Sequence, residues 1–354
     1  MTEPFITIGS KVIKKGCCPL IVAEMSGNHN GDKAKALAII DAASKNGAHA
    51  IKLQTYTPET LTINSRRPEF FIDDSTSIWH GKRLWDLYTE AHTPWEWHED
   101  LFQFARSKGL ACISTAFDLN SLKFLLSINV DAIKISSFEI IHIPLLIEAS
   151  RSQKPMLIST GMATESEIRK AVDTIRNEGC EDFILLKCTS AYPSTEQDAN
   201  IVTMVDMRQK YKCHVGLSDH TLSPYTAFAA TAHGAVLIEK HFTISRSEGG
   251  VDSNFSIEPS ELQQLRVGTE MIWKSLGKVC YDPLTSERAS LKERPSIYVV
   301  KTIDSGQEFT ESNTRIIRPS GGLLPEFYYQ ILGKRAKVSI EAETPLSWDL
   351  IEPS

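Results

Sequence analysis

The sequence lacks a basic excess, a long apolar run and a paired-cysteine motif. It has 38 lysine and arginine residues and 44 acidic ones, a net charge of −6, which argues against general nucleic-acid or membrane-surface binding. No apolar run approaches the roughly 20 residues that span a bilayer, and Met1–Ile8 has no features of a secretion signal. The seven cysteines form no Cys-x-x-Cys pair, and only Cys17 and Cys18 are adjacent. We therefore expect a cytoplasmic protein with reduced thiols.

A Gly-x-Gly-x-x-Gly turn is also absent after the first β-rich run, so nothing predicts a dinucleotide site. Eight short apolar runs alternate with segments of helical periodicity, as in a parallel sheet buried on both faces. The expected strands are Leu20–Glu24, Ala48–Gln54, Ala111–Thr115, Ala132–Ser136, Pro155–Ser159, Phe183–Cys188, His214–Leu217 and Val236–His241. The expected helices are Lys33–Asn46, Glu99–Lys108, Ser121–Ile128, Ile143–Ser150, Glu165–Asn177, Ile201–Tyr211, Pro224–His233 and Ser260–Leu276. This pattern predicts a closed (β/α)8 TIM barrel, with an open doubly wound sheet as the alternative.

Three segments depart from a plain barrel. Phe5–Ile8 and Lys11–Ile13 predict a hairpin that plugs one end of the barrel. Residues 55–94 are too many for an ordinary βα loop, and their aromatic and charged side chains predict a lid, a binding loop or a subunit contact. Strand-like runs at Ile297–Val300, Arg315–Arg318 and Ala336–Ile340 predict a small β-rich domain. The expected division is a catalytic domain at 1–280, a linker at 281–295 and a second domain at 296–354.

Polar residues gather where the predicted strands end, which in a barrel is where catalytic residues converge. His220 and His241 follow neighbouring strands seven and eight, so their imidazoles can share one metal ion and leave positions for water or substrate. A lone histidine is more often structural, and His29 is interpreted in that way. Glu239 and Lys240, next to His241, are expected to point elsewhere.

Lys52 and Lys134 lie in apolar strands, where a buried lysine requires an anion. With nearby hydroxyls they predict a site for a small dianion such as phosphate; a Schiff-base lysine is the competing interpretation. The hydroxyls are those of Thr115, Ser137, Ser159, Ser190 and Ser218. Glu24, Glu139 and Asp252 are the candidates for proton transfer or for hydrogen bonding to a sugar.

The ordered strand-end motifs resemble the sialic acid synthase family. They are Ala23-Glu24, Asn28-His29-Asn30-Gly31, Ile51-Lys52-Leu53-Gln54, Ser114-Thr115, Lys134-Ile135-Ser136-Ser137, Ser159-Thr160-Gly161-Met162, Gly216-Leu217-Ser218-Asp219-His220 and Glu239-Lys240-His241-Phe242-Thr243. Ile317–Gly322 and Leu332-Gly333 resemble the antifreeze-like (SAF, β-clip) domain of those enzymes. Within the family, Gln54–Pro58 and Leu84–Tyr88 look most like the pseudaminic acid synthases.

The resemblance implies that phosphoenolpyruvate condenses with an N-acetylated amino sugar and water to give a nine-carbon 2-keto acid and phosphate. It implies that His220 and His241 hold Mn²⁺ or Mg²⁺, and that Glu24 and Glu139 transfer or orient protons. It places phosphoenolpyruvate on Lys52, Thr115, Lys134, Ser137, Ser159, Ser190 and Ser218, and the sugar on Gln54, Tyr192 and Asp252. Arg318 would come from the other subunit of a domain-swapped homodimer.

Two departures concern the sugar rather than the reaction. Phe138 replaces a glycine that is usual in the family, and Ser190 stands where many members carry asparagine. The expected sugar is 2,4-diacetamido-2,4,6-trideoxy-altrose, with N-acetylneuraminate or legionaminate synthesis as the alternative. A hydrophobic contact from Phe138 would fit a deoxygenated sugar.

Two further hypotheses remain: a Schiff-base aldolase on the same barrel, and a non-catalytic carbohydrate- or ice-binding protein. The metal-dependent interpretation fails if the two imidazoles lie far apart, or if the lysines are buried against carboxylates elsewhere.

Overall fold

The computed structural model describes residues 5–75 and 77–353, so residues 1–4 and 354, at the outer ends of the predicted domains, and residue 76 in the long insertion lie outside it. The chain divides into two compact units, Met1–Gly277 and Lys278–Ser354. Among the described residues, no helix has the length and apolar character needed to cross a membrane.

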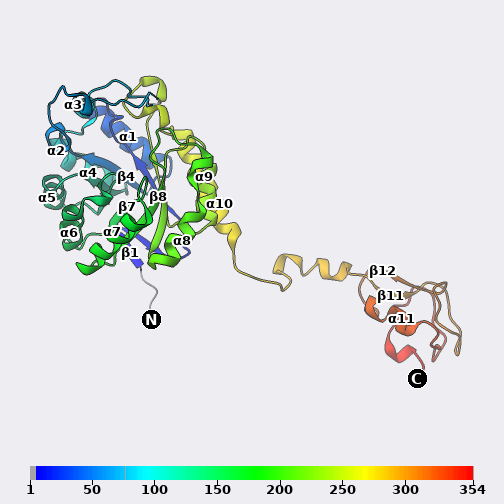
Figure 1. The fold of residues 1–354 in the computed structure, drawn as a ribbon. Coiled ribbons are helices and arrows are strands. Elements are labelled where there is room, and N and C mark those ends of the chain that lie inside the picture. Colours follow the sequence, from blue (N-terminus) through cyan, green and yellow to red (C-terminus); the bar gives the residue numbers. More distant parts are fainter. Residues whose placement is uncertain (1–4, 76, 354) are drawn as a thin grey trace. The chain divides into compact units, whose positions relative to one another are not determined.

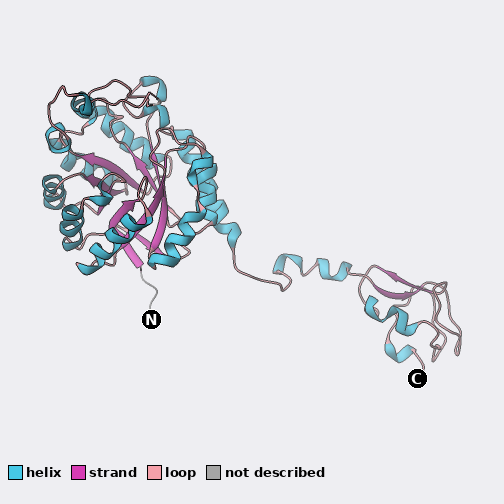
Figure 2. Cartoon of the chain, viewed as in Figure 1, coloured by secondary structure: helices cyan, strands magenta, loops and turns pink. Residues whose placement is uncertain are grey.

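The first unit is a closed barrel of eight parallel strands in the order β10-β3-β4-β5-β6-β7-β8-β9, ringed by helices (Figures 1 and 2). The strands are β3 (Leu20–Glu24), β4 (Ala50–Thr55), β5 (Ala111–Ala116), β6 (Ala132–Ile135), β7 (Met156–Ser159), β8 (Phe183–Cys188), β9 (His214–Asp219) and β10 (Leu237–His241). The surrounding helices are α1 (Lys33–Lys45), α4 (His98–Ser107), α5 (Leu119–Ser127), α6 (Ile143–Arg151), α7 (Glu165–Asn177), α8 (Val202–Tyr211), α9 (Tyr225–Ala232) and α10 (Pro259–Leu276). The predicted barrel is confirmed, and the open sheet is excluded.

Alternation along each strand divides the core into two layers. On β4, Ile51 and Leu53 pack in the layer shared with the helices. Ala50 packs inside the barrel, so Lys52, two residues further along, also points inward. An apolar strand therefore delivers a lysine to the barrel interior near its carboxyl end.

The predicted hairpin is present as β1 (Phe5–Ile8) paired antiparallel with β2 (Lys11–Lys14). Gly9 takes a φ of +58° at the turn, a conformation that glycine adopts without strain. Ile6, Ile8 and Ile13 are buried in the same cluster as the inward residues near the strand starts. The hairpin thus closes the end of the barrel opposite the strand ends.

The long insertion between β4 and α4 contains helices α2 (Pro58–Leu61) and α3 (Leu84–Ala91). Two buried histidines hold the point where it rejoins the barrel. His29 Nε2 lies 3.1 Å from the Thr93 hydroxyl, with its Nδ1 accepting from Gly31 N–H. His98 Nδ1 donates to the Pro94 carbonyl at 3.2 Å, while the Thr55 hydroxyl lies 2.8 Å from His98 Nε2.

The second unit contains β11 (Ser296–Val299), β12 (Thr314–Ile317) and α11 (Tyr328–Ile331) around a small apolar core. The expected strand Ala336–Ile340 was wrong. Only isolated bridges form there, Ile303 with Ile340 and Ala336 with Ile351. Residues 337–339 are exposed between two buried positions, so the segment lacks the alternating burial of a strand.

The buried histidines predict loss of stability in acid. Burial lowers the pKa of His98 to about 4, although hydrogen bonds to Pro94 and Trp95 oppose the shift. The unfolded chain therefore binds more protons than the folded one between about pH 6.5 and pH 4, and the free energy of unfolding falls as the pH drops through that window. We expect His98→Gln to flatten this fall by up to about 3 kcal/mol at pH 4, measured by urea unfolding at several pH values.

Exposed His80 provides the matched control, because His80→Gln should leave the pH dependence as it is in the wild type. Equal slopes for the His98→Gln variant and the wild type would contradict the prediction.

Candidate active site

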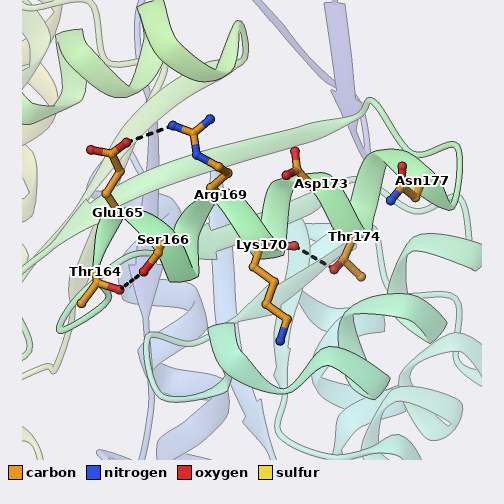
Figure 3. A pocket seen from close by; sticks show the side chains of 8 residues that line it. All are labelled: Thr164, Glu165, Ser166, Arg169, Lys170, Asp173, Thr174 and Asn177. Carbon is orange, nitrogen blue, oxygen red and sulfur yellow. Dashed lines mark hydrogen bonds and ion pairs between the residues drawn. The ribbon is translucent and has the colours of Figure 1, made fainter.

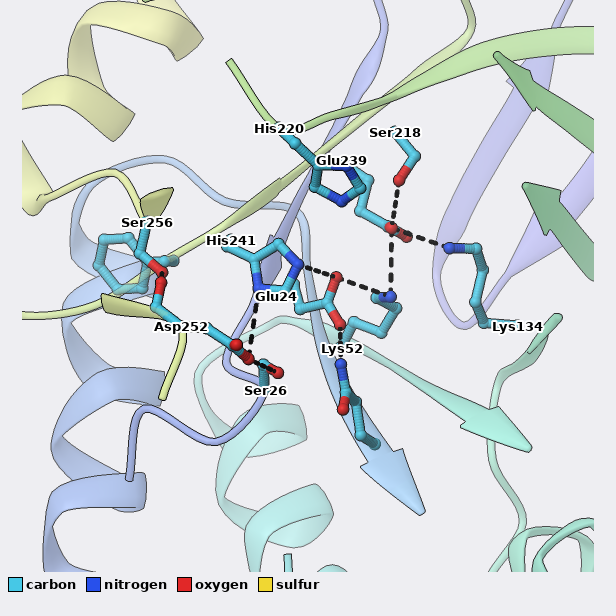
Figure 4. A network of polar contacts seen from close by, with 12 residues as sticks. Glu24, Ser26, Lys52, Lys134, Ser218, His220, Glu239, His241, Asp252 and Ser256 are labelled. Atoms are coloured by element: carbon cyan, nitrogen blue, oxygen red, sulfur yellow. Dashed lines mark hydrogen bonds and ion pairs between the residues drawn. The ribbon is translucent and has the colours of Figure 1, made fainter. Parts of the chain in front are cut away.

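The strand ends carry a buried cluster of two lysines and two carboxylates (Figure 4). Lys52 Nζ lies 2.8 Å from Glu24 Oε2 and 3.1 Å from Glu239 Oε1. Lys134 Nζ lies 2.8 Å from the same Glu239 oxygen, to which the Ser218 hydroxyl donates at 2.9 Å. Strand register explains the grouping, since His241 stands beside Glu24 and Glu24 beside Lys52 on β10, β3 and β4.

Glu239 corrects an expectation from the sequence. Leu237 packs inside the barrel and Ile238 in the outer layer, so Glu239 and His241 both point inward by alternation. Lys240 does point away, with Nζ 2.8 Å from Asp219 Oδ2. The two-residue spacing from His241 was the signal that could have identified Glu239.

Electrostatics favour the ionised forms of Glu239 and Lys52 but not that of Lys134. Burial disfavours the carboxylate form of Glu239, but the charges of Lys134 and Lys52 outweigh it and lower the Glu239 pKa. Burial likewise opposes the charge of Lys52, whose pKa is nevertheless raised by Glu239 and Glu24. For Lys134 burial prevails, and its pKa falls below the ordinary lysine value.

The two predicted histidines come together. The ring centroids of His220 and His241 are 5.4 Å apart, and both side chains are buried. His220 Nδ1 lies 2.8 Å from the Thr189 carbonyl, so the other ring nitrogen, Nε2, is the one available to bind a metal ion. His241 Nε2 lies 3.4 Å from Glu24 Oε2, so the imidazoles and the lysine cluster share one rim rather than separate places.

The site fits a metal ion that takes part of its coordination from substrate and water. The described residues contain no group of three or more histidine, cysteine or acidic side chains placed to hold a metal. His241 Nδ1, Glu239 Oε2 and Ser159 Oγ are buried without a hydrogen-bond partner. Such orphaned atoms are rare in folded proteins and indicate groups awaiting a ligand, ion or water.

The predicted hydroxyls also line this rim. Thr115, Ser137, Ser159 and Ser218 are buried, and Ser190 is partly buried. A Cβ on Gly161 would lie 2.2 Å from Ser190 Oγ and 2.8 Å from Ser137 Oγ. Because only glycine leaves that room, the loop after β7 lets hydroxyls from two other strand ends converge.

Aromatic rings surround the histidine pair. Tyr192 packs on His220 at 4.4 Å between ring centroids, and Phe255 on His241 at 4.9 Å. Trp79 of the insertion lies 5.6 Å from Tyr192 and donates from Nε1 to the Val251 carbonyl at 3.1 Å. The insertion therefore reaches the site, as expected of a binding loop.

The remaining predicted residues lie in different surroundings. Gln54 Nε2 donates to Glu24 Oε1 at 2.8 Å. Glu139 lies outside the ion cluster, where it accepts from the Ser136 hydroxyl and burial raises its pKa. Phe138 is 57% exposed, and Arg318 belongs to the second unit, where it is exposed.

Apart from the strand ends, a hollow lies along the outer side of α7 (Figure 3). All its lining residues come from that helix and the residue before it, from Thr164 to Asn177. Two of its charged groups pair within the helix, Arg169 with Glu165 at 2.9 Å. This surface has the character of a solvated helix face and brings no catalytic groups together.

Glu239→Gln tests the importance of the cluster for stability. It leaves Lys134 buried without its carboxylate partner, so we expect the free energy of unfolding to fall by about 3 kcal/mol, measured by urea unfolding with tryptophan fluorescence.

Glu248→Gln is the control, because it breaks the half-exposed pair with Lys35 at 3.0 Å and should cost less than about 1 kcal/mol. Similar losses in the two variants would mean that Lys134 is uncharged in the free protein.

Comparison with known proteins gives a consistent result for both units. Residues 39–281 match the NeuB family and residues 294–352 the SAF domain. The pseudaminic acid synthase of Helicobacter pylori is 40% identical over 338 residues, 95% of this chain and 98% of that protein. The pseudaminic acid synthase of Campylobacter jejuni strain 81-176 is 39% identical over 324 residues, 91% and 93% of the two chains. The crystal structure of the N-acetylneuraminic acid synthetase of Leptospira borgpetersenii with citrate matches with a TM-score of 0.72 at 34% identity, covering 82% of this chain and 95% of that one.

Proposed function

Because the chain belongs to the NeuB family, we propose that it condenses phosphoenolpyruvate with 2,4-diacetamido-2,4,6-trideoxy-altrose, as a pseudaminic acid synthase. The methylene carbon of phosphoenolpyruvate bonds to the sugar aldehyde carbon, whose oxygen takes up a proton. Water adds to C2 of the three-carbon unit, and phosphate leaves with cleavage of the C–O bond. The matches to the NeuB family and to the SAF domain confirm the family resemblance drawn from the strand-end motifs.

The observation that carries this proposal is the ion cluster beside the histidine pair. Lys52 and Lys134 contribute two positive charges and Glu24 and Glu239 two negative ones, so the cluster is neutral. A neutral cluster attracts a dianion weakly, and added positive charge is needed to hold phosphoenolpyruvate. The adjacent imidazoles are placed to bring that charge.

We assign His220 and His241 as ligands of a divalent ion, Mn²⁺ or Mg²⁺. When bound, the ion supplies Lewis-acid polarisation of the sugar aldehyde. The chain's own residues bind the anion through lysines and hydroxyls: Lys52, Lys134, Thr115, Ser137, Ser159, Ser190 and Ser218. Gln54, Tyr192 and Asp252 are proposed to contact the sugar.

The two catalytic carboxyls have opposite environments. Burial disfavours ionised Glu24, but His241, Lys52 and Lys134 together lower its pKa, so Glu24 stays a carboxylate, which suits accepting a hydrogen bond from the attacking water and orienting it. Burial raises the pKa of Glu139, which suits a donor of the proton that the aldehyde oxygen takes up. Opposed pKa shifts of this kind separate acid and base roles in one site.

The finer features are also proposals. The two synthases compared above make pseudaminic acid the first choice of product, and the Leptospira protein keeps N-acetylneuraminate or a legionaminate as the alternative. We place the reaction in the cytoplasm, consistent with seven free cysteines. We further propose a domain-swapped homodimer in which Arg318 completes the partner's site.

Phosphate release tests the reaction. Full-length protein with phosphoenolpyruvate and Mn²⁺ should release phosphate with the 2,4-diacetamido-trideoxy sugar faster than with N-acetylmannosamine, by about tenfold or more for each polar contact mismatched. EDTA should stop release and Mn²⁺ should restore it.

The same preparation distinguishes the aldolase. Borohydride with pyruvate should label no lysine; labelling, with activity that survives rigorous metal removal, would establish the Schiff-base mechanism instead. Saturable sugar binding without phosphate release would favour a carbohydrate-binding protein.

Subunit mixing tests the role of Arg318. Arg318→Ala should lower turnover and leave Mn²⁺ affinity unchanged, whereas Arg315→Ala, on β12 just before it, should change neither turnover nor Mn²⁺ affinity. In a random mixture of Arg318→Ala and His241→Ala chains, half the dimers hold one intact site, so activity should recover to about a quarter of the wild-type value. No recovery above the separate variants would place Arg318 in its own subunit's site or outside any site.

A further inference from the structure

His241 lies between two carboxylates. Its Nε2 is 3.4 Å from Glu24 Oε2, and its Nδ1 is 4.0 Å from Asp252 Oδ2 (Figure 4). Nδ1 is buried without a hydrogen-bond partner. Asp252 therefore approaches the edge of the imidazole away from the lysine cluster, whereas the sequence alone had suggested proton transfer or a sugar contact for this residue.

Asp252 is firmly held in that position. The Ser26 hydroxyl donates to Asp252 Oδ2, and Ser256 Oγ donates to the Asp252 carbonyl at 2.7 Å. Asn28 Nδ2 bonds both Ser256 Oγ at 2.8 Å and the Phe242 carbonyl at 3.0 Å. Because Phe242 follows His241 directly, this network ties the carboxylate to the strand end that carries the imidazole.

Ser26 adopts an unusual backbone conformation for its position. Its φ is +46° and the residue is 1% exposed, although a left-handed conformation costs a non-glycine residue about 1 kcal/mol or more. Glycine would adopt this conformation without strain. What serine adds is the hydroxyl on Asp252.

A histidine that binds a metal through one nitrogen is oriented by an acceptor on the other. His220 has such an acceptor, since its Nδ1 faces the Thr189 carbonyl at 2.8 Å. We propose that Ser26 and Asp252 are positioning residues for His241, which direct its Nδ1–H toward Asp252 and so present Nε2 to the metal. A shift of about 1 Å brings Nδ1 and Oδ2 within hydrogen-bond distance. The inference rests on the proposed metal site but not on the identity of the sugar.

Mn²⁺ affinity tests the inference with the metal alone. The affinity is to be measured on the full chain without substrates, by electron paramagnetic resonance of the free ion. Ser26→Gly removes the hydroxyl and suits the backbone, and Asp252→Asn removes the carboxylate charge. Each should weaken Mn²⁺ binding about 10- to 100-fold, with KM for phosphoenolpyruvate near the wild-type value at saturating Mn²⁺.

Ser253→Ala is the matched control, because it removes a buried hydroxyl of the same loop that bonds the Gly250 carbonyl at 3.0 Å. It should leave Mn²⁺ affinity unchanged, while His241→Ala should abolish the site. Unchanged Mn²⁺ affinity in both Ser26→Gly and Asp252→Asn would overturn the inference, and a raised KM for the sugar in Asp252→Asn would then leave Asp252 with the sugar contact alone.

The outcomes separate this inference from the proposed reaction. A wild type that releases phosphate but binds Mn²⁺ no better than His241→Ala overturns the positioning role and leaves the condensation standing. A wild type that binds Mn²⁺ through His241 but releases no phosphate with any sugar overturns the condensation alone.

Discussion

The structure depends on the compensation of four charges buried at the strand ends. Moving one such ion out of water costs several kcal/mol, which only close and complete pairing offsets. Lys52 reaches both Glu24 and Glu239, and Lys134 reaches Glu239. These contacts join β3, β4, β6 and β10 across the closed sheet. A slip of one residue in the pairing of a strand would turn its inward side chains outward. The geometry of the site therefore depends on the strand register of the barrel.

Charge neutrality explains how the same cluster can stabilise the free protein and still take part in the proposed reaction. Paired lysines keep the free protein stable without a bound anion, whereas unpaired ones would repel each other in a medium of low dielectric constant. The cost is weak attraction for a dianion such as the proposed phosphoenolpyruvate. Orphaned polar atoms at Ser159 and Glu239 are groups that a ligand and an ion would satisfy, and the orphaned Nδ1 of His241 is the atom that we assign to Asp252. Their number at one rim distinguishes this place from the hollow along α7.

Local patterns in the sequence were enough to predict the barrel and much of the site. Apolar runs located the strands, and their polar ends located His220, His241 and Lys52. Strand alternation also predicts that Glu239 points inward with His241. This was missed because Glu239 and Lys240 were both expected to point away from the site. The contact of Trp79 with Tyr192 depends on how an insertion folds back over the barrel, and the left-handed conformation of Ser26 on how two loops meet. Neither has a periodic signal, because both arise from contacts between residues far apart in the chain.

The choice of sugar is better explained by the aromatic rings around the histidine pair than by Phe138. Phe138, singled out by its departure from the family pattern, is 57% exposed. Tyr192 and Phe255 instead pack directly on the imidazoles, and Trp79 extends the same apolar surface from the insertion. An aldehyde held at the imidazoles would place the rest of an open-chain sugar near these rings. A deoxygenated carbon loses little by leaving water for such a surface, whereas a hydroxyl there would need a partner. In the proposed reaction, discrimination between sugars would therefore come from the insertion and the loops after β8 and β10, while the lysine cluster, proposed to bind the three-carbon unit, would serve every sugar alike.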